Sequence, residues 1–197
     1  MQKIDIREQK KQFRFRSKQY RESLDYSGKE KLDTMIADNL LSVKQVVECK
    51  TVLCYMSTKI EVETDGIISK LLQDKKTVAV PRCADNIVDM DFYIINDINE
   101  TEKRTFGVRE PIVEKCQKLR DFRGAVCIVP ALGFDREGFR LGYGKGCYDR
   151  FLSGFRGVKI GICYENCVYD LLPHGFYDIP ADLIVTENGI YLPKQDF

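Results

Sequence analysis

A glycine-dense stretch with two strong cations is the part of this sequence best suited to chemistry. Residues 129–152 read VPALGFDREGFRLGYGKGCYDRFL and hold five glycines together with Arg140 and Lys145. The stretch follows an apolar run that predicts a buried strand, and it leads into a predicted helix. Ligands of α/β proteins bind beyond the carboxyl ends of strands, where glycine lets backbone N–H groups approach an anion. Together with the positive end of the helix, this composition suits a nucleoside triphosphate.

The spacing of the glycines differs from the two common phosphate-binding motifs. A Walker A loop requires Ser or Thr after its lysine, and here Lys145 is followed by Gly146. A dinucleotide fingerprint requires a third glycine after Gly142-x-Gly144, and Cys147 stands in its place. The glycine content alone is also compatible with a plain flexible loop.

Two acidic residues near this stretch are candidate ligands for Mg²⁺. Asp149 lies four residues after Lys145, at the start of the predicted helix, where it would face the phosphates or simply favour the helix dipole. Asp178, in HGFYDIPADLIV, precedes the last buried strand and is the second candidate. Asp182 is its rival, and capping of a loop is the alternative for both.

Two helices are predicted before the first strand. Residues 1–22 carry a net charge of +5 against −4 for the rest of the chain, which fits a phosphate-seeking or a solvated helix face. Phe13, Tyr20 and Leu24 fall at i, i+7 and i+11, which predicts one buried helical stripe. A capping box, Ser27-x-x-Glu30, predicts the start of a second helix that ends near residue 48.

Strands and helices then alternate along the chain. Apolar runs predict buried strands at residues 51–56, 77–81, 90–95, 125–130, 158–163 and 183–186. Short helices are predicted after Thr64, through 148–152 and near 165–172, with an irregular segment over 96–124. This order predicts one domain over residues 1–197, a three-layer α/β fold with a mostly parallel central sheet and helices on both faces.

Composition limits the function classes. The 197 residues carry 31 basic and 30 acidic side chains, no apolar run approaches a membrane span, and the polar N-terminus lacks a secretory signal. The eight cysteines form no CxxC pair, so reduced thiols in a cytoplasmic protein are expected. With His174 as the only histidine, neither a structural zinc site nor a histidine-based dyad is favoured.

The glycine stretch also supports a family assignment. FDREGFRLGYGKGCYDRFL resembles the C-terminal signature of the 5-formyltetrahydrofolate cyclo-ligases, also called 5,10-methenyltetrahydrofolate synthetases. Other islands of the family pattern follow in order along the chain: KKQFR (10–14), YMSTKIEVET (55–64), VPR (80–82), DFY (91–93) and FGVREP (106–111). Cys147 stands where the family usually has Tyr, and Ala131 where it often has Gly, but neither difference removes a charge.

The resemblance implies that 5-formyltetrahydrofolate and MgATP give 5,10-methenyltetrahydrofolate, ADP and phosphate. Transfer of the γ-phosphoryl group to the formyl oxygen would make that oxygen a good leaving group, and N10 would then close the ring. Such chemistry needs positioning and charge neutralisation rather than a covalent nucleophile. The expected partners are therefore ATP and the folate, with or without a polyglutamate tail. The chain is expected to be a monomer, with no nucleic-acid or membrane partner.

The resemblance also implies a role for individual residues. Lys145 and Arg140 would be catalytic, and Asp149 and Asp178 would hold Mg²⁺. The residues expected to bind ATP are Lys10, Lys11, Gln12, Phe13, Arg14, Arg140, Leu141, Gly142, Tyr143, Gly144, Lys145, Gly146, Cys147 and Tyr148. Those expected to bind the folate are Met56, Glu61, Tyr143, Gly144, Lys145, Gly146 and Cys147.

Structural roles remain the alternatives at several of these positions. Lys10 and Arg14 could lie on a solvated helix face, Met56 could be a buried strand end, and Glu61 a surface acid. For the whole chain, the main alternative is a non-catalytic nucleotide- or RNA-binding module, which the basic N-terminus favours and the near-neutral total charge disfavours. A different ATP-dependent ligase or kinase would need the same loop but not Glu61.

Overall fold

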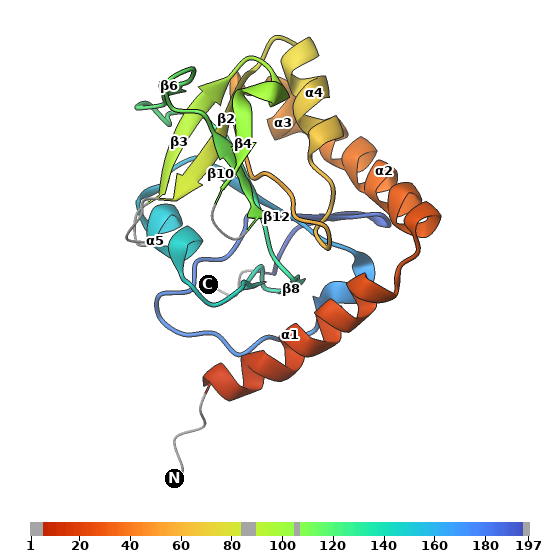
Figure 1. Cartoon of the computed structure of the whole chain (residues 1–197). Helices are drawn as coiled ribbons and strands as arrows, with labels where there is room; N and C mark the ends of the chain where they lie inside the picture. The colour runs from red at the N-terminus through yellow and green to blue at the C-terminus, as the bar shows by residue number, and fades with distance from the viewer. Residues whose placement is uncertain (1–5, 84–89, 105–106, 195–197) are drawn as a thin grey trace.

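A central eight-stranded sheet organises the chain (Figure 1). The computed structural model describes residues 6–83, 90–104 and 107–194. The helices are α1 (Ile6–Ser23), α2 (Tyr26–Ser42), α3 (Lys44–Glu48), α4 (Asp65–Gln73), α5 (Cys147–Gly154) and the 3-10 helices η1 (Ile98–Glu100) and η3 (Glu165–Cys167). The strands of the large sheet are β1 (Thr51–Cys54), β2 (Thr77–Cys83), β3 (Met90–Ile95), β6 (Gln117–Lys118), β7 (Val126–Val129), β10 (Val158–Ile162), β12 (Leu183–Thr186) and β13 (Gly189–Tyr191).

The strand order confirms the predicted, mostly parallel sheet. The order is β13-β12-β10-β7-β1-β2-β3-β6, and the five strands from β12 to β2 are parallel. β13 pairs antiparallel with β12 on one side, and on the other side β3 pairs antiparallel with β2 and β6 antiparallel with β3. Across the sheet from β2 to β12, the parallel strands are β2, β1, β7, β10 and β12, which are the second, first, third, fourth and fifth of them along the chain. The order therefore reverses between β1 and β7, and such a switch point opens a crevice at the carboxyl ends of the two strands.

Helices cover both faces of the sheet, as predicted. Successive residues of a strand point to opposite faces. Val52 and Cys54 therefore pack in the same apolar cluster as Ile36 of α2, whereas Leu53 lies in the cluster that contains Leu152 of α5. In Figure 1, α2, α3 and α4 accordingly lie on one side of the sheet and α5 on the other. Among the described residues, no helix combines the length and apolarity needed to cross a bilayer.

Two small sheets and α1 complete the carboxyl edge of the large sheet. The first small sheet joins β11 (Val168–Tyr169), β8 (Gly133–Asp135) and β9 (Arg140–Leu141), and the second pairs β4 (Thr101–Lys103) with β5 (Arg109–Pro111). Helix α1 packs against the first, because the Phe13 and Tyr169 rings meet edge to face at 4.9 Å and the Ser17 and Tyr169 hydroxyls hydrogen bond at 2.7 Å. The short helix predicted near 165–172 is present only as the 3-10 helix η3, and β11 follows it where the prediction had helix.

The second helix begins and ends differently from the prediction. Asp25, not Ser27, is the N-cap, and its carboxylate accepts a hydrogen bond from the Gly28 N–H at 2.7 Å. The helix stops at Ser42 because Val43 is extended, with φ −61° and ψ 125°, and α3 starts afresh at Lys44. The buried Val43 side chain packs in the core, so the bend lets one apolar segment follow the sheet surface.

Arg21 of α1 joins two loops of the large sheet. Its guanidinium donates hydrogen bonds to the Ala131 and Leu132 carbonyls, which follow β7, and to the Ile60 carbonyl in the loop that follows β1. The donor–acceptor distances lie between 2.8 and 3.2 Å, and only 3% of the residue is exposed. A single buried cation therefore ties together the loops that follow β1 and β7, on the two sides of the switch point.

Replacement of Arg21 should destabilise the fold strongly. In Arg21→Ala, three buried carbonyls lose a charged donor, which should lower the free energy of unfolding by about 3 kcal/mol. Urea denaturation followed by circular dichroism measures this loss. Gln19→Ala, an exposed change on the same helix, is the matched control and should stay within about 0.5 kcal/mol of the parent. Equal stability of the two variants would contradict the bracing role of Arg21.

Candidate active site

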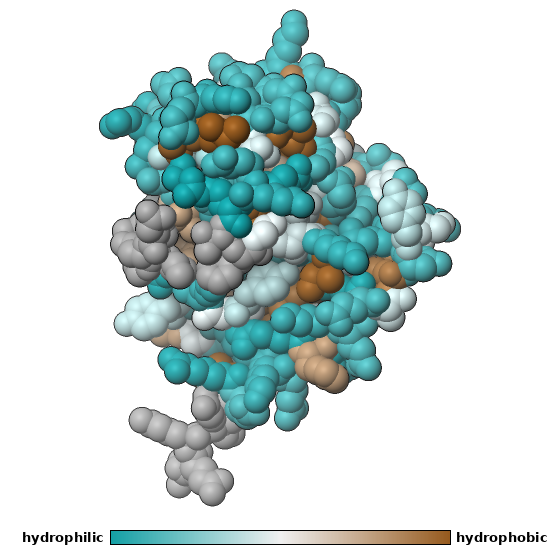
Figure 2. All heavy atoms as spheres, in the orientation of Figure 1, coloured by the Kyte–Doolittle hydropathy of each residue, from teal (hydrophilic) through white to brown (hydrophobic). Residues whose placement is uncertain are grey.

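A pocket of about 430 Å³ opens at the carboxyl ends of β1, β2 and β7, at the switch point of the sheet. In Figure 2, hydrophobic atoms lie recessed across the middle of an otherwise mostly hydrophilic face. The pocket is lined by Tyr55, Met56, Thr58, Ile60, Glu61, Pro81, Cys83, Met90, Val108, Glu110, Pro130, Arg140, Gly142, Tyr143, Lys145, Gly146, Cys147, Tyr148 and Asp149. We call it the sheet-edge pocket.

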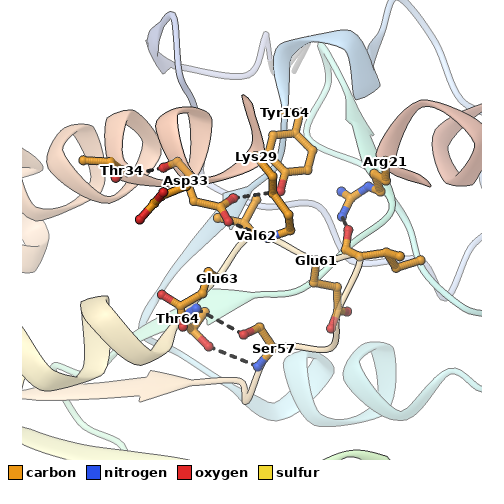
Figure 3. Close-up of polar contacts among 12 residues, drawn as sticks. Arg21, Lys29, Asp33, Thr34, Ser57, Glu61, Val62, Glu63, Thr64 and Tyr164 are labelled. Atoms are coloured by element: carbon orange, nitrogen blue, oxygen red, sulfur yellow. Dashed lines mark hydrogen bonds and ion pairs between the residues drawn. The ribbon is translucent and has the colours of Figure 1, made fainter. Parts of the chain in front are cut away.

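The loop of residues 55–64, between β1 and α4, forms one wall and presents Glu61. The Glu61 residue is only 4% exposed, and its Oε2 accepts hydrogen bonds from the Thr58 backbone N–H at 2.8 Å and the Thr58 hydroxyl at 2.7 Å. Figure 3 shows Arg21 reaching this loop from one side while the Glu61 carboxylate points to the other. The carboxylate is therefore held in one orientation rather than left as a surface acid.

Thr64 holds the same loop closed instead of capping α4 with its side chain. Its hydroxyl donates to the Tyr55 carbonyl at 2.8 Å, and its backbone N–H donates to the Ser57 hydroxyl at 3.2 Å (Figure 3). Thr64 is the N-cap residue of α4, as the predicted helix start requires, but its side chain makes no capping bond. The Glu63 carboxylate takes that role, because it accepts hydrogen bonds from the Asp65 and Gly66 N–H groups.

The glycine loop, residues 142–146, forms the opposite wall. Gly144 and Gly146 have φ values of +98° and +68°, in the left-handed region that favours glycine. Gly146 is the N-cap residue of α5, and Lys145 lies directly before it. The loop therefore places an ammonium group beside the positive end of a helix, an arrangement that attracts anions.

Helix α1 docks on the glycine loop through its cations. Arg14 Nε donates to the Gly142 carbonyl at 2.8 Å, and Lys10 Nζ pairs with Asp178 Oδ2 at 2.8 Å. The Lys10 and Asp178 side chains are 13% and 24% exposed, so this ion pair is partly shielded from water. Lys10 and Arg14 are one helical turn apart and both point toward these loops. They therefore do not lie on a solvated face of the helix.

Asp149 and Asp178 come together beside Arg140. Arg140 Nη2 pairs with Asp149 Oδ2 at 2.8 Å, while Asp149 Oδ1 accepts the Ile179 N–H at 3.3 Å, one residue from Asp178. Burial raises the pKa of Asp178, but hydrogen bonds from Lys10 and Gly175 and the charge of Arg140 outweigh it and leave the pKa lowered. Asp178 is therefore ionised at neutral pH, and both carboxylates lie among cations.

The chemistry of this acidic pair fits a divalent cation that arrives with phosphates. Among the described residues, no group of three or more acidic, histidine or cysteine side chains could hold a metal ion. Mg²⁺ is usually bound by one or two carboxylates and completes its shell with water and phosphate oxygens. Asp182, the rival of Asp178, is committed elsewhere, because it accepts hydrogen bonds from the Lys159 N–H and pairs with the Lys159 ammonium.

Two buried donors in the pocket have spare hydrogen-bonding capacity. Within the described part of the chain, Arg140 Nη1 and the Tyr148 hydroxyl are buried and make no hydrogen bond. Burial, followed by the charge of nearby groups that include Glu61, raises the pKa of Tyr148 well above its usual value. Tyr148 is therefore a neutral donor, and Arg140 has a free guanidinium edge for an anion.

Several residues predicted from the sequence lie away from the pocket. Lys11 and Gln12 are exposed, and Lys11 pairs with Glu8 at 3.6 Å on the outside of α1. Phe13 and Leu141 pack in an apolar cluster with Leu132 and Leu172 under the small sheet. His174 also lies outside the pocket, where it stacks on the Phe139 ring at 3.6 Å.

The sequence reasoning did not single out Thr58, Cys83, Val108 or Glu110, which also line the pocket. Three of these lie within islands of the family pattern, because Thr58 belongs to YMSTKIEVET, and Val108 and Glu110 to FGVREP. The first residue of FGVREP, Phe106, lies outside the described residues. Their place within these islands was therefore the feature of the sequence that could have identified Thr58, Val108 and Glu110 as pocket residues.

Comparisons with known proteins agree with this site and fold. The sequence model of the 5-formyltetrahydrofolate cyclo-ligase family matches residues 6–187. The chain is 26% identical to the 5-formyltetrahydrofolate cyclo-ligase of Escherichia coli K12, over 88% of this chain and 98% of the relative. It is 27% identical to that of Saccharomyces cerevisiae, over 85% and 90%.

A solved structure extends the agreement to three dimensions. The 5,10-methenyltetrahydrofolate synthetase of Aquifex aeolicus superposes with a TM-score of 0.82 at 28% identity, over 95% of this chain and 94% of that one. The family match spans both walls of the sheet-edge pocket, from α1 to the end of β12. The chain therefore belongs to the 5-formyltetrahydrofolate cyclo-ligase family, and its activity is that of the family.

Proposed function

We propose that the sheet-edge pocket is where this chain converts 5-formyltetrahydrofolate to 5,10-methenyltetrahydrofolate, with ATP as the phosphoryl donor. One observation carries the assignment to this pocket. The fixed carboxylate of Glu61 and the cations Arg140 and Lys145 line the same cavity, from opposite walls. A folate that hydrogen bonds to Glu61 can thus bring its formyl group toward the cationic loop, where the γ-phosphate of ATP would lie.

The reaction needs two displacements and no protein nucleophile. The formyl oxygen attacks the γ-phosphorus, and the bond from phosphorus to the bridging oxygen of ADP breaks. N10 then attacks the activated formyl carbon, the carbon–oxygen bond breaks, and phosphate leaves with the oxygen. N10 loses its proton in this step, and the product is the five-membered methenyl ring. Positioning and charge stabilisation are what such a sequence requires from a protein.

The glycine loop and α1 would bind the nucleotide. The N–H groups of residues 142–146 and the spare Nη1 of Arg140 would donate to phosphate oxygens. Lys145 would stabilise charge on the transferring phosphoryl group, and Lys10 and Arg14 would approach the phosphates from α1. Because these α1 cations face the protein's own loops, they offer little to an RNA backbone, which disfavours the nucleic-acid alternative.

The 55–64 loop would bind the folate. A reduced pterin presents neighbouring N–H and NH₂ donors on one edge, and a carboxylate has about four acceptor positions, of which Thr58 occupies two. Met56 would pack on the pterin from the pocket floor, and Tyr143 would line the entrance. Tyr143 lies near Thr58 and Glu61, and burial followed by the charge of Glu61 raises the pKa of its hydroxyl, so it stays neutral.

Asp149 and Asp178 would hold Mg²⁺ together with the phosphates. The ion would supply charge neutralisation for the phosphate oxygens, a role suited to the two carboxylates beside Arg140. We further propose that the chain acts as a monomer.

Lys145→Ala should lower kcat on the order of 10²–10³-fold, because the ammonium acts mainly on charge that develops in the transition state. The methenyl product absorbs in the near ultraviolet, so its formation can be followed directly. Lys31→Ala, an exposed change on α2, is the control and should retain full activity. A rise in the KM for ATP with kcat unchanged would show instead that Lys145 contributes only to the binding of ATP and not to stabilisation of the transition state.

Glu61→Gln should weaken folate binding roughly 5- to 150-fold, because leaving a pterin donor unpaired costs about 1–3 kcal/mol. The amide oxygen can still accept from Thr58, so the loop should keep its shape, while the amide NH₂ opposes a pterin donor. Calorimetry with each ligand separately is the measurement, and ATP affinity should barely change. Glu114→Gln, an exposed substitution, is the control. An equal loss for both ligands would remove Glu61 from the folate side.

Asp149→Asn should raise the Mg²⁺ concentration needed for half-maximal activity, by roughly 10- to 100-fold, the scale on which metal sites respond to loss of a supporting group. The measurement is a Mg²⁺ titration at saturating ATP. Asp74→Asn, on the far end of α4, should leave the titration unchanged. Full turnover of the parent chain in EDTA would contradict the metal role altogether.

A further inference from the structure

Two cysteines meet at one side of the sheet-edge pocket. Cys83 is the last residue of β2 and Cys147 is the first residue of α5. Both line the pocket, and burial, followed by the nearby Cys147, raises the pKa of the Cys83 thiol. All eight cysteines of the chain are outside disulfides, and five of them, Cys54, Cys116, Cys127, Cys163 and Cys167, are buried in the core.

The surroundings of the pair suit oxidation. Arg150 Nη2 lies 4.0 Å from Cys147 Sγ as a donor, and the charge of Lys145 acts on Cys83. Reactive cysteines occur in such electropositive and partly exposed environments. Cys83 is exposed and Cys147 half-exposed. Because Cys83 lies next to Cys147 at the pocket wall, it is the thiol placed to resolve a sulfenic acid formed on Cys147.

We propose that Cys83 and Cys147 form a reversible disulfide in the presence of a peroxide, and that this bond blocks the pocket. The Cys147 thiol takes one oxygen atom from the peroxide and becomes a sulfenic acid, with release of water. The Cys83 sulfur then attacks the Cys147 sulfur, and the hydroxyl group leaves as a second water. Two thiols lose two protons and two electrons in total, which the peroxide accepts as it becomes two waters, and a dithiol reductant reverses the change.

The bond would act on the functional loop directly. Lys145 and Gly146 precede Cys147, so a covalent tie to β2 would fix the end of the glycine loop and place the sulfur bridge in the pocket wall. Misplacement of positioning groups by about 1 Å can lower a rate on the order of 10²-fold. The inferred inhibition thus rests on the proposed function of the pocket, whereas formation of the disulfide does not.

The test uses the purified full-length chain, treated with hydrogen peroxide and then digested without reduction. Mass spectrometry should find the Cys83 and Cys147 peptides joined, with activity lowered on the order of 10²-fold and restored by dithiothreitol. Cys83→Ser and Cys147→Ser should each keep their own starting activity through the treatment. Cys49→Ser, which removes a half-buried thiol outside the pocket, should remain as sensitive as the parent chain.

Phenylarsine oxide provides a second measurement on the parent chain, without substitution. Its trivalent arsenic bridges two adjacent thiols, and prior binding should prevent formation of the disulfide. Recovery of the two peptides unjoined after peroxide, or joined to other cysteines, would overturn the proposal. A joined pair with unchanged activity would overturn the inhibition. A chain that lacks cyclo-ligase activity but still joins the two peptides would contradict the proposed function and leave the modification site standing.

Discussion

The buried guanidinium of Arg21 is the interaction on which the geometry of the pocket depends. It donates to carbonyls that follow β7 and to one in the loop that follows β1, the two strands that flank the switch point. A parallel sheet leaves loops at its carboxyl edge with unpaired carbonyl groups, which cannot stay buried without donors. One cation with five N–H groups satisfies several of them at once and fixes the distance between the loops. Glu61 and Pro130 lie next to the bonded residues, so the pocket walls inherit that fixed distance.

The same face of α1 continues from this structural anchor to the glycine loop. Lys10, Arg14, Ser17 and Arg21 are spaced by four, three and four residues, so they form one stripe along the helix. Arg21 braces the loops, Ser17 contacts Tyr169, and the two remaining residues reach the glycine loop and Asp178. The residues of the predicted apolar stripe, Phe13, Tyr20 and Leu24, lie on this same side of the helix. The fully buried residues of that side, however, are the polar Ser17 and Arg21. Hydrophobic spacing alone could therefore place the buried face of the helix without revealing what that face does.

The sequence predicted best where local signals and tertiary contacts agree. The runs that became β1, β2, β7, β10 and β12 are mostly apolar because helices cover both faces of the sheet, and that pattern can be seen without knowledge of the neighbouring strands. The cap at Ser27 failed because Asp25 offered an equivalent acceptor two residues earlier. The short strands β4, β5 and β6 escaped prediction because two or three residues carry no periodicity. In the site, the glycine loop and Glu61 were predicted from sequence motifs. Thr58 was missed because its role is to hold the Glu61 carboxylate in place, which only the folded structure shows.

The cations and carboxylates of the site are already paired with one another, which sets how a phosphate can enter. Arg140 pairs with Asp149, and Lys10 with Asp178, so the region carries little net charge although it holds several charged groups. A buried cation without a partner would be costly, and these pairs avoid that cost before a ligand arrives. Because a guanidinium has donors on separate edges, Arg140 can keep Asp149 on Nη2 and offer Nη1 to an oxygen anion. A divalent cation on the carboxylates would compensate the phosphates that approach the same cations. Ligand and ion should therefore bind together more tightly than either binds alone, since each supplies the charge that the other leaves unbalanced.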